Sequence, residues 1–533
     1  MKIVKLSRIF MYGMAFLISF FLVIISFCYV IDIKNMAIKN DSILYCLLAV
    51  MGFLLLMELY FKFTSINLSL FNKILLGIVL CYSILICLFW IYNSKSLPAG
   101  DQKSIYDMAM RAVNHDLLAV APTGSYLSLW PFQSGLLFVY EAILRLIPSA
   151  NHTTIQLTNV VFIPLLIISG YHLLKKWIHH EKAITYFLVL IAFCFPYYLY
   201  SNFMYGEIPS VGLIFFSSWM LTEYKSSGKI RYAFLASGSV FLAMLYRTNT
   251  LIFVVACMIA FIITFLQERR LREFIIIVLL LLATVTASNF PRFFYEHRAN
   301  NTMGAGVPAI SYLAMGMQPE GGAAPGWWNG YHSNLYMELD YNAELTSEYS
   351  IQSIKESLHY FATHPTEAIA FYNKKLITQW CDQNYSCFNS TESLFEDRRD
   401  IAWNIYSGKL NIVLLEIMNY HQTITYLGLF LFCSIPVITW LGKRKSGILI
   451  FRNDINDFEN YLLMICVIGG FLFSIIWEGN SRYVFPYTVM MLPYTAIGYD
   501  KLMSVIHSIF THLLSHSHIE HQHDSDHANL KAK

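Results

Sequence analysis

Apolar residues form long runs along this 533-residue chain, and short polar stretches separate them. A helix needs about 20 apolar residues to cross the hydrocarbon core of a bilayer. Runs of about that length, some of them shorter, predict about twelve spans, at residues 9–31, 42–61, 72–92, 155–174, 183–200, 209–222, 232–246, 250–266, 274–290, 422–441, 460–477 and 484–499. The pattern therefore predicts an all-α, polytopic transmembrane helical bundle.

Two features of these runs refine the prediction. The first run follows three basic residues and is too long for the core of a cleaved signal peptide, so we expect it to remain as a span. The polar residues 246–249 separate two later runs. We expect two helices joined there by a tight turn rather than one long helix.

The run at 132–147 is short, lies between Pro131 and Pro148, and carries Glu141 and Arg145 at a spacing that allows them to pair on one helix face. If this run does not span, the basic clusters between the other runs all fall on the cytoplasmic side. We therefore expect a juxtamembrane helix in the outer interface. Both termini are then cytoplasmic.

This topology divides the chain into six parts. They are the N-terminal spans (1–92), a first large outer loop with juxtamembrane helices (93–154), a central bundle (155–290), an extracytoplasmic segment (291–421), the C-terminal spans (422–500) and a cytoplasmic His-rich tail (501–533). The histidines of the tail could bind metal, but a solvated, disordered tail is the favoured interpretation.

Composition supports this class. The chain is 56% hydrophobic and 13% charged, with a mean hydropathy of +0.50, which excludes an ordinary water-soluble fold. A net charge of +3 is too small to indicate a nucleic-acid partner. Phosphate-binding loops, dinucleotide fingerprints and zinc-spaced Cys/His sets are absent, which argues against ATP or zinc hydrolysis. Cys381 and Cys387 lie in a polar stretch, and whether they form a disulfide is left open.

An aspartate stands where the third run ends. Asp101 follows Pro98 and Gly100 and precedes a predicted helix. Aspartate at such a place often caps the helix. The same position faces the region where a lipid phosphate would lie. Two interpretations of Asp101 therefore stay open, a helix cap and a functional carboxylate.

A second acid and several cations also lie near predicted membrane boundaries. Glu207, in "SNFMYGEIPS", has no basic residue in its short loop, and an unpaired carboxylate there is costly, so it is a functional candidate. Arg482, in "EGNSRYVFPY", opens the last span. Guanidinium groups match phosphate geometry, which makes Arg482 and Arg247 candidate phosphate ligands. For Arg292 and Arg298 an ordinary flanking role is favoured.

Aromatic residues gather in a Gly/Pro-rich stretch of the extracytoplasmic segment. Trp327, Trp328 and Tyr331 lie in "MGMQPEGGAAPGWWNGYH". Rings of this kind suit stacking on a sugar, and they suit an interfacial belt almost as well.

Together these stretches resemble the GT-C superfamily of polytopic glycosyltransferases, which includes protein O-mannosyltransferases, lipid A aminoarabinose transferases and oligosaccharyltransferase catalytic subunits. The matching pieces are Asp101 early in the first outer loop, "SLWPFQSGLL", Glu207 in "MYGEIPS" and "NSRYVFPY" before a late span. Their order and sidedness carry the resemblance, because each motif is short.

The resemblance implies transfer of a sugar, with inversion, from a polyprenyl-phosphate donor to a hydroxyl or amine of a cell-envelope acceptor on the extracytoplasmic face. It implies that Asp101 is the general base, that Glu207 orients the acceptor or helps to hold a metal, and that Arg482 binds the donor phosphate. Arg247 joins it in that role. The substrate-binding residues would be Asp107, Gln133, Tyr205, Trp327, Trp328 and Tyr331.

Departures from the family pattern limit this analogy. Several relatives carry a phosphate-binding lysine before the proline that opens the juxtamembrane helix, whereas here Leu129 and Trp130 precede Pro131. This shifts the phosphate role toward Arg482. Asp107 would project from a different helix face than Asp101, so a metal site is unsupported and no cofactor is certain.

Two other functions remain as alternatives. A polysaccharide polymerase or ligase with a polyprenyl diphosphate-linked donor would be favoured by arginine-rich outer loops, which are modest here. A lipid or glycan transporter would commonly place charged residues at mid-membrane in two symmetric halves. Here the acids lie at one face, so a membrane glycosyltransferase is the favoured function.

Overall fold

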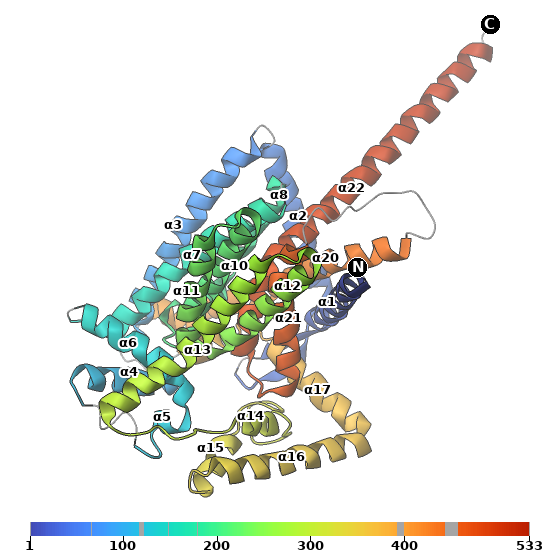
Figure 1. Cartoon of the computed structure of the whole chain (residues 1–533). Coiled ribbons are helices and arrows are strands. Elements are labelled where there is room, and N and C mark those ends of the chain that lie inside the picture. The colour runs from blue at the N-terminus through green and yellow to red at the C-terminus, as the bar shows by residue number, and fades with distance from the viewer. Residues whose placement is uncertain are drawn as a thin grey trace.

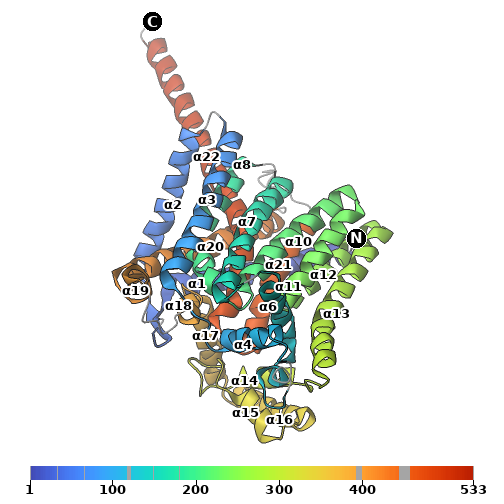
Figure 2. The same cartoon turned by 90° about the vertical axis from the view of Figure 1, so that its left-hand side faces the viewer.

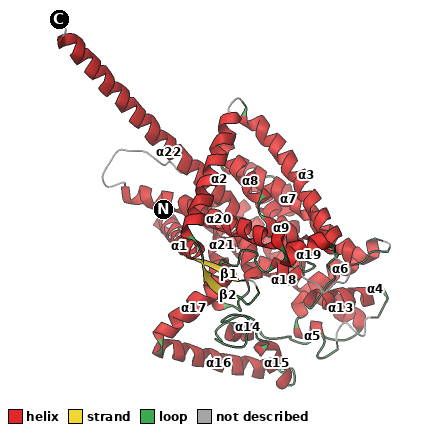
Figure 3. Ribbon diagram, turned by 180° about the vertical axis from the view of Figure 1, so that it is seen from behind, coloured by secondary structure: helices red, strands yellow, loops and turns green. Residues whose placement is uncertain are grey.

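The computed structural model describes residues 2–32, 34–64, 67–116, 122–147, 149–178, 180–391, 399–442 and 457–531. The chain is helical almost throughout, which confirms the all-α prediction. The one sheet among the described residues is a hairpin of β1 (Tyr29–Asp32) and β2 (Ala37–Asn40), paired antiparallel (Figure 3). It joins the first two long helices, and the sequence analysis had not predicted it.

The predicted apolar runs fall mostly in helices, although the last residues of the first run, 29–31, belong to β1. They lie in α1 (Lys2–Cys28), α2 (Ile43–Phe63), α3 (Leu68–Ser94), α7 (His152–Trp177), α8 (Glu181–Ala192), α9 (Phe195–Leu199), α10 (Glu207–Ser227), α11 (Ile230–Tyr246), α12 (Leu251–Glu268), α13 (Leu271–Ala299), α20 (Lys409–Gly442), α21 (Asp457–Ile476) and α22 (Ser481–Lys531).

Six helices of the described chain are long and apolar enough to cross a membrane, fewer than the twelve predicted spans. The run at 183–200 is broken, because α8 and the short helix after it are bent by 52°. The helices at 230–246 and 461–476 are apolar but shorter. The polytopic character is thus confirmed, while the number of spans stays a prediction.

The long apolar helices run side by side as a bundle, and most of the remaining helices gather at one end (Figures 1 and 2). That end carries α4 (Asp101–Val113), α5 (Tyr126–Leu129), η1 (Pro131–Gln133), α6 (Ser134–Leu146), α14 (Ala309–Met315), α15 (Tyr331–Glu338), α16 (Ala343–Thr363), α17 (Pro365–Trp380), α18 (Cys387–Thr391) and α19 (Asp400–Ser407). The C-terminal tail departs from the disordered interpretation, since α22 continues through it to Lys531 and extends beyond the bundle.

Two local predictions are confirmed. Helix α11 ends at Tyr246 and α12 begins at Leu251, with a single 3-10 turn between them, so the polar stretch is a tight junction. In α6, Arg145 Nε donates to Glu141 Oε1 at 2.8 Å.

Cys381 and Cys387 are both free and buried, so they form no disulfide.

The carboxylate of Glu141 also accepts hydrogen bonds from a second helix. The hydroxyl of Tyr295 donates to it at 2.6 Å and Arg298 Nη1 at 2.9 Å, both from α13. Arg145 Nη2 in turn donates to the carbonyl of Ala112 near the end of α4, at 2.6 Å. Because one buried carboxylate holds α6 to α13 and its arginine holds α4, the helix that begins at residue 101 has a fixed position.

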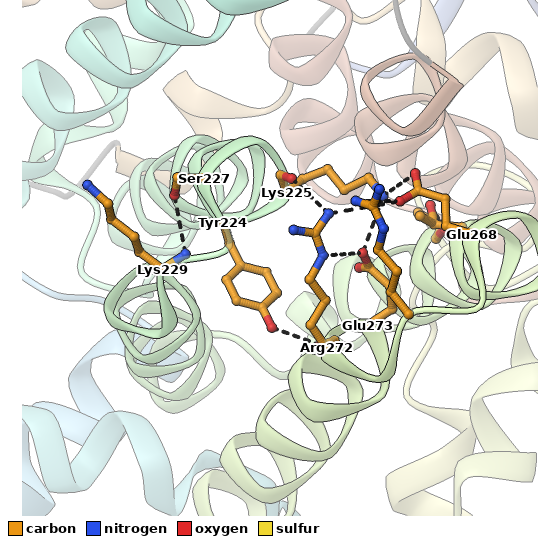
Figure 4. A network of polar contacts seen from close by, with 10 residues as sticks. Tyr224, Lys225, Ser227, Lys229, Glu268, Arg272 and Glu273 are labelled. Carbon is orange, nitrogen blue, oxygen red and sulfur yellow. Dashed lines mark hydrogen bonds and ion pairs between the residues drawn. The ribbon is translucent and has the colours of Figure 1, made fainter.

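The opposite end of α10 from Glu207 carries a separate polar network (Figure 4). Lys225 Nζ lies 2.6 Å from Glu268 and 3.3 Å from Glu273, and Arg272 Nε lies 3.1 Å from Glu273. These contacts tie the α10–α11 turn to the α12–α13 turn. Lys225 and Arg272 belong to the basic clusters that the sequence predicts on the cytoplasmic side.

Candidate functional site

A cavity of about 790 Å³ lies at the end of the bundle that carries α4 and α14. Six separate stretches of the chain line it: the start of α4, the α5–η1 region, the loop before α10, the α11–α12 turn, the segment at 291–421 and the α21–α22 turn. Its charged and amide side chains include Asp101, Gln102, Gln133, Arg247, Asn249, Asn389, Asn480, Glu478 and Arg482. The fold therefore gathers charged groups that are far apart in the sequence.

Asp101 is the first residue of α4 and its side chain is exposed at this cavity. The residue in the cap position is Gly100, with a φ of +55°, so the N-cap interpretation of Asp101 is wrong. Gln102, which follows, is buried: its amide donates to the carbonyl of Ser390 at 3.1 Å and accepts from the amide of Met204 at 2.8 Å. These bonds fix the start of α4 against the loop that leads to Glu207.

Glu207 is the first residue of α10 and is only 2% exposed. Its Oε1 lies 3.3 Å from Arg247 Nη2 and 3.6 Å from Arg482 Nε. The sequence loop around Glu207 contains no cation, but tertiary packing supplies two. Gly206, at a φ of +89°, is required before it, because a Cβ there would lie 2.5 Å from the carbonyl oxygen of Tyr246.

The two arginines separate Glu207 from the main cavity. Glu207 lines a small hollow of about 30 Å³, whereas Asp101 lines the main cavity. Arg247 and Arg482 line both spaces. The two acids thus line different spaces, and the same two arginines line both.

Tyr205 keeps the arginines in place from the cavity side. The Cζ atoms of Arg247 and Arg482 lie 4.9 and 5.2 Å from the centre of its ring, within the range of cation–π attraction. Gln133 Nε2 donates to its hydroxyl at 2.7 Å, and the hydroxyl of Tyr126 lies 3.2 Å away. Gln133 and Tyr205 both line the cavity, and their substrate-binding role stays a prediction.

Of the other four predicted substrate-binding residues, two lie outside the cavity and two line it. Asp107 is exposed, pairs with Lys103 on the outer face of α4 and does not line the cavity. Tyr331, at the start of α15, does not line it either. Trp327 and Trp328 do line it: Trp327 is buried and donates from Nε1 to Thr378 at 3.2 Å, while Trp328 is 60% exposed.

Glu478 was missed by the sequence analysis, although it stands four residues before Arg482 in "EGNSRYVFPY". It lines the cavity, is 5% exposed and accepts a hydrogen bond of 2.6 Å from the hydroxyl of Tyr483. Burial raises the pKa of Glu478 to about 7, with a further rise from Asp101, while Tyr483 and Arg482 oppose the shift. An acid between two helices carries no periodicity signal, so only its burial identifies it.

An aromatic wall of Trp130, Tyr312, His332 and Trp477 also lines the cavity. The rings of Tyr312 and Trp477 are stacked at 5.2 Å, and the His332 ring meets Tyr312 edge-on at 4.5 Å. Burial lowers the pKa of His332 to about 4, so its ring is neutral at physiological pH. The aromatic wall therefore offers apolar ring faces beside the charged side chains of the same cavity.

Metal ligands do not cluster in the described part of the chain, where no group of three or more His, Cys, Asp or Glu side chains is placed to hold an ion. Among the described residues, the cavity is instead lined by the carboxyl groups of Asp101 and Glu478 and by the guanidinium groups of Arg247 and Arg482. Such an arrangement suits a bound anion next to a site of proton transfer.

Comparison with known proteins gives structural likenesses alone. No family of known proteins matches the chain by sequence, and no curated protein does. The structure is similar to the Archaeoglobus fulgidus oligosaccharyltransferase in its apo form, with a TM-score of 0.44 and 13% identity over 84% of this chain and 52% of that one. This chain spans about half the length of that protein.

A second similar structure is ArnT from Cupriavidus metallidurans bound to undecaprenyl phosphate, with a TM-score of 0.29 and 12% identity over 79% of this chain and 78% of that one.

Proposed function

We propose that this chain is an integral membrane glycosyltransferase that transfers one sugar from a polyprenyl-phosphate donor to a cell-envelope glycan outside the cytoplasm. The observation that carries the proposal is the placement of Asp101 and the Arg247–Arg482 pair on one cavity. A general base and a phosphate-binding pair are the two charged elements that such a transfer needs.

The reaction follows from this placement. Asp101 accepts the proton of the acceptor hydroxyl, whose oxygen bonds to the anomeric carbon. The bond between that carbon and the phosphate oxygen breaks, and its electron pair leaves with the lipid phosphate. Arg247 and Arg482 stabilise the charge that develops there, and attack opposite the leaving group inverts the anomeric configuration.

Glu207 acts in this scheme through the arginines rather than on the acceptor. Its carboxylate is buried, and within the described part of the chain its ion pairs are to the guanidinium groups of Arg247 and Arg482. A buried anion holds two flexible side chains in one orientation and lowers the mutual repulsion of their charges. This replaces the acceptor or metal role that the resemblance implied.

The aromatic wall supports a carbohydrate as substrate, because sugar rings present apolar faces that stack on aromatic rings. Paired arginines would also suit a donor with two phosphates, and so the polymerase or ligase alternative stays in the test. Localisation in the cell membrane, with the cavity on the extracytoplasmic side, follows from the proposed topology.

The decisive experiment supplies the purified protein, in lipid nanodiscs, with labelled sugars on polyprenyl phosphate and on polyprenyl diphosphate. Cell-envelope glycan is the acceptor. We expect labelled product from the monophosphate donor and almost none from Asp101→Asn. Product from the diphosphate donor alone would favour the polymerase or ligase, and undiminished turnover in a well-folded Asp101→Asn would remove the proposed base.

A further inference from the structure

Lys375 of α17 is fully buried and lies outside the cavity. Its Nζ donates three hydrogen bonds to backbone carbonyls, at 2.6 Å to Gly316, 2.7 Å to Trp477 and 3.0 Å to Ile475. An ammonium group has three donors, and a neutral amine has two. All three bonds together need the charged form. Burial lowers the pKa of Lys375 to about 7, whereas Glu478 favours the charged form. With three bonds made, none of its donors is left for a substrate.

The three carbonyls belong to two helix ends. Gly316 is the C-cap of α14, and Ile475 and Trp477 lie at the end of α21. Carbonyls at a helix C-terminus lack partners within the helix and carry partial negative charge. A buried cation between two such ends satisfies both of them, and it joins two segments that are far apart in the sequence.

The backbone around the Lys375 ammonium group is closely packed. The amide of Gly479 donates to the carbonyl of Gly326 at 2.6 Å, so the extracytoplasmic segment pairs with the α21–α22 turn. Gly326 has a φ of +69°, and a Cβ there would lie 2.5 Å from the carbonyl oxygen of Gly316 and 2.9 Å from Lys375 Cε. A side chain at position 326 would therefore displace the lysine.

Both joined segments carry a wall of the cavity. Helix α14 presents Tyr312, and the α21–α22 turn presents Trp477 and Glu478, followed by Arg482 in the first turn of α22. We propose that Lys375 is a positioning residue that locks the extracytoplasmic segment onto the α21–α22 turn and so sets the distance between these two walls. Its consequence for catalysis rests on the proposed function, whereas the lock itself does not.

Hydrogen exchange tests the lock without any substrate. The full-length protein in nanodiscs is compared with Lys375→Met and with Lys374→Met, a control at the exposed neighbouring lysine. We expect amides of segments 316–327 and 475–480 to exchange about tenfold faster or more in Lys375→Met, both segments together, because their shared anchor is lost. Lys374→Met should match wild type. Unchanged exchange of both segments in Lys375→Met would overturn the proposal.

Gly326→Ala keeps the lysine and disturbs the same contact, so it provides the test if Lys375→Met does not fold. It should loosen the same two segments, and wild-type exchange in that variant would count against the lock.

Kinetics then separate positioning from general structure. We expect the transfer rate per folded molecule to fall about a hundredfold in Lys375→Met, as when reacting groups are misplaced by about 1 Å. The loss should be much smaller in an Arg482→Gln background, because the lysine acts through that turn. An equal fold-loss from Lys375→Met in the wild-type and Arg482→Gln backgrounds would contradict this positioning role. Absence of transfer in wild type would refute the proposed function and leave the exchange result standing.

Discussion

Arg482 Nε lies 3.6 Å from Oε1 of Glu207, and the two residues come from the first turns of α22 and α10. The carboxylate is on the far side of the guanidinium from the main cavity. Arg482 Nε makes no hydrogen bond within the described residues. The cation is thus held beside its buried partner, while its side chain also lines the main cavity.

Replacing Arg482 should weaken donor binding. We expect Arg482→Gln to raise the KM for the donor about tenfold or more, because a charge-assisted bond to phosphate is lost. Arg482→Lys should recover only part of this, since the ammonium lacks the planar group that stacks on Tyr205. Steady-state kinetics with varied donor test both variants. A fully active Arg482→Gln would exclude the arginine from the site.

Glu207→Gln should destabilise the protein as well as slow it. Loss of the buried anion leaves Arg247 and Arg482 close together without compensation, which costs about 3 kcal/mol. The apparent melting temperature in detergent should fall clearly. Glu348→Gln, at an exposed carboxylate on α16, is the control and should leave it unchanged. Equal melting temperatures for the two variants would show that the ion pairs of Glu207 contribute little to stability.

Glu478 should make donor binding sensitive to pH. Burial raises the pKa of this carboxyl to about 7, so it is mostly neutral below that pH and ionised above it. The ionised form competes for Arg482 and repels an anionic donor. We expect the KM for the donor to rise about fivefold from roughly pH 6 to roughly pH 8, the order for one unit charge at close range. Glu478→Gln should abolish the rise.

Asp107 offers a matched comparison with Asp101. Both lie on α4, but only Asp101 lines the cavity, while Asp107 pairs with Lys103 at the surface. We expect Asp107→Asn to retain transfer within about twofold of wild type, as for a surface ion pair of small energy. A large loss in a folded Asp107→Asn would restore the substrate-binding role predicted from the sequence.

The side of the membrane can be tested with single cysteines. Trp328 is exposed at the cavity, and Ser227 is exposed at the other end of α10 from Glu207. We expect an impermeant maleimide to label Trp328→Cys in intact cells and Ser227→Cys only after permeabilisation. The reverse pattern would place the cavity on the cytoplasmic side.

The sequence by itself determined the helices, because apolar length and helical spacing act over a few neighbouring residues. It located the junction at 246–249 and the Glu141–Arg145 pair, both of which depend on local geometry. It also marked Asp101, Glu207 and Arg482 as charges placed unusually near apolar runs.

Only the tertiary structure decided which of these charges meet. Glu207 and Arg482 are brought together by the packing of helices that are distant in sequence, and no periodicity encodes that contact. The same holds for Lys375, whose partners are backbone carbonyls of two other helices. Burial converted Glu478 from an ordinary loop acid into a group that titrates near neutrality. Desolvation depends on everything packed around a residue, so a linear sequence pattern cannot carry it.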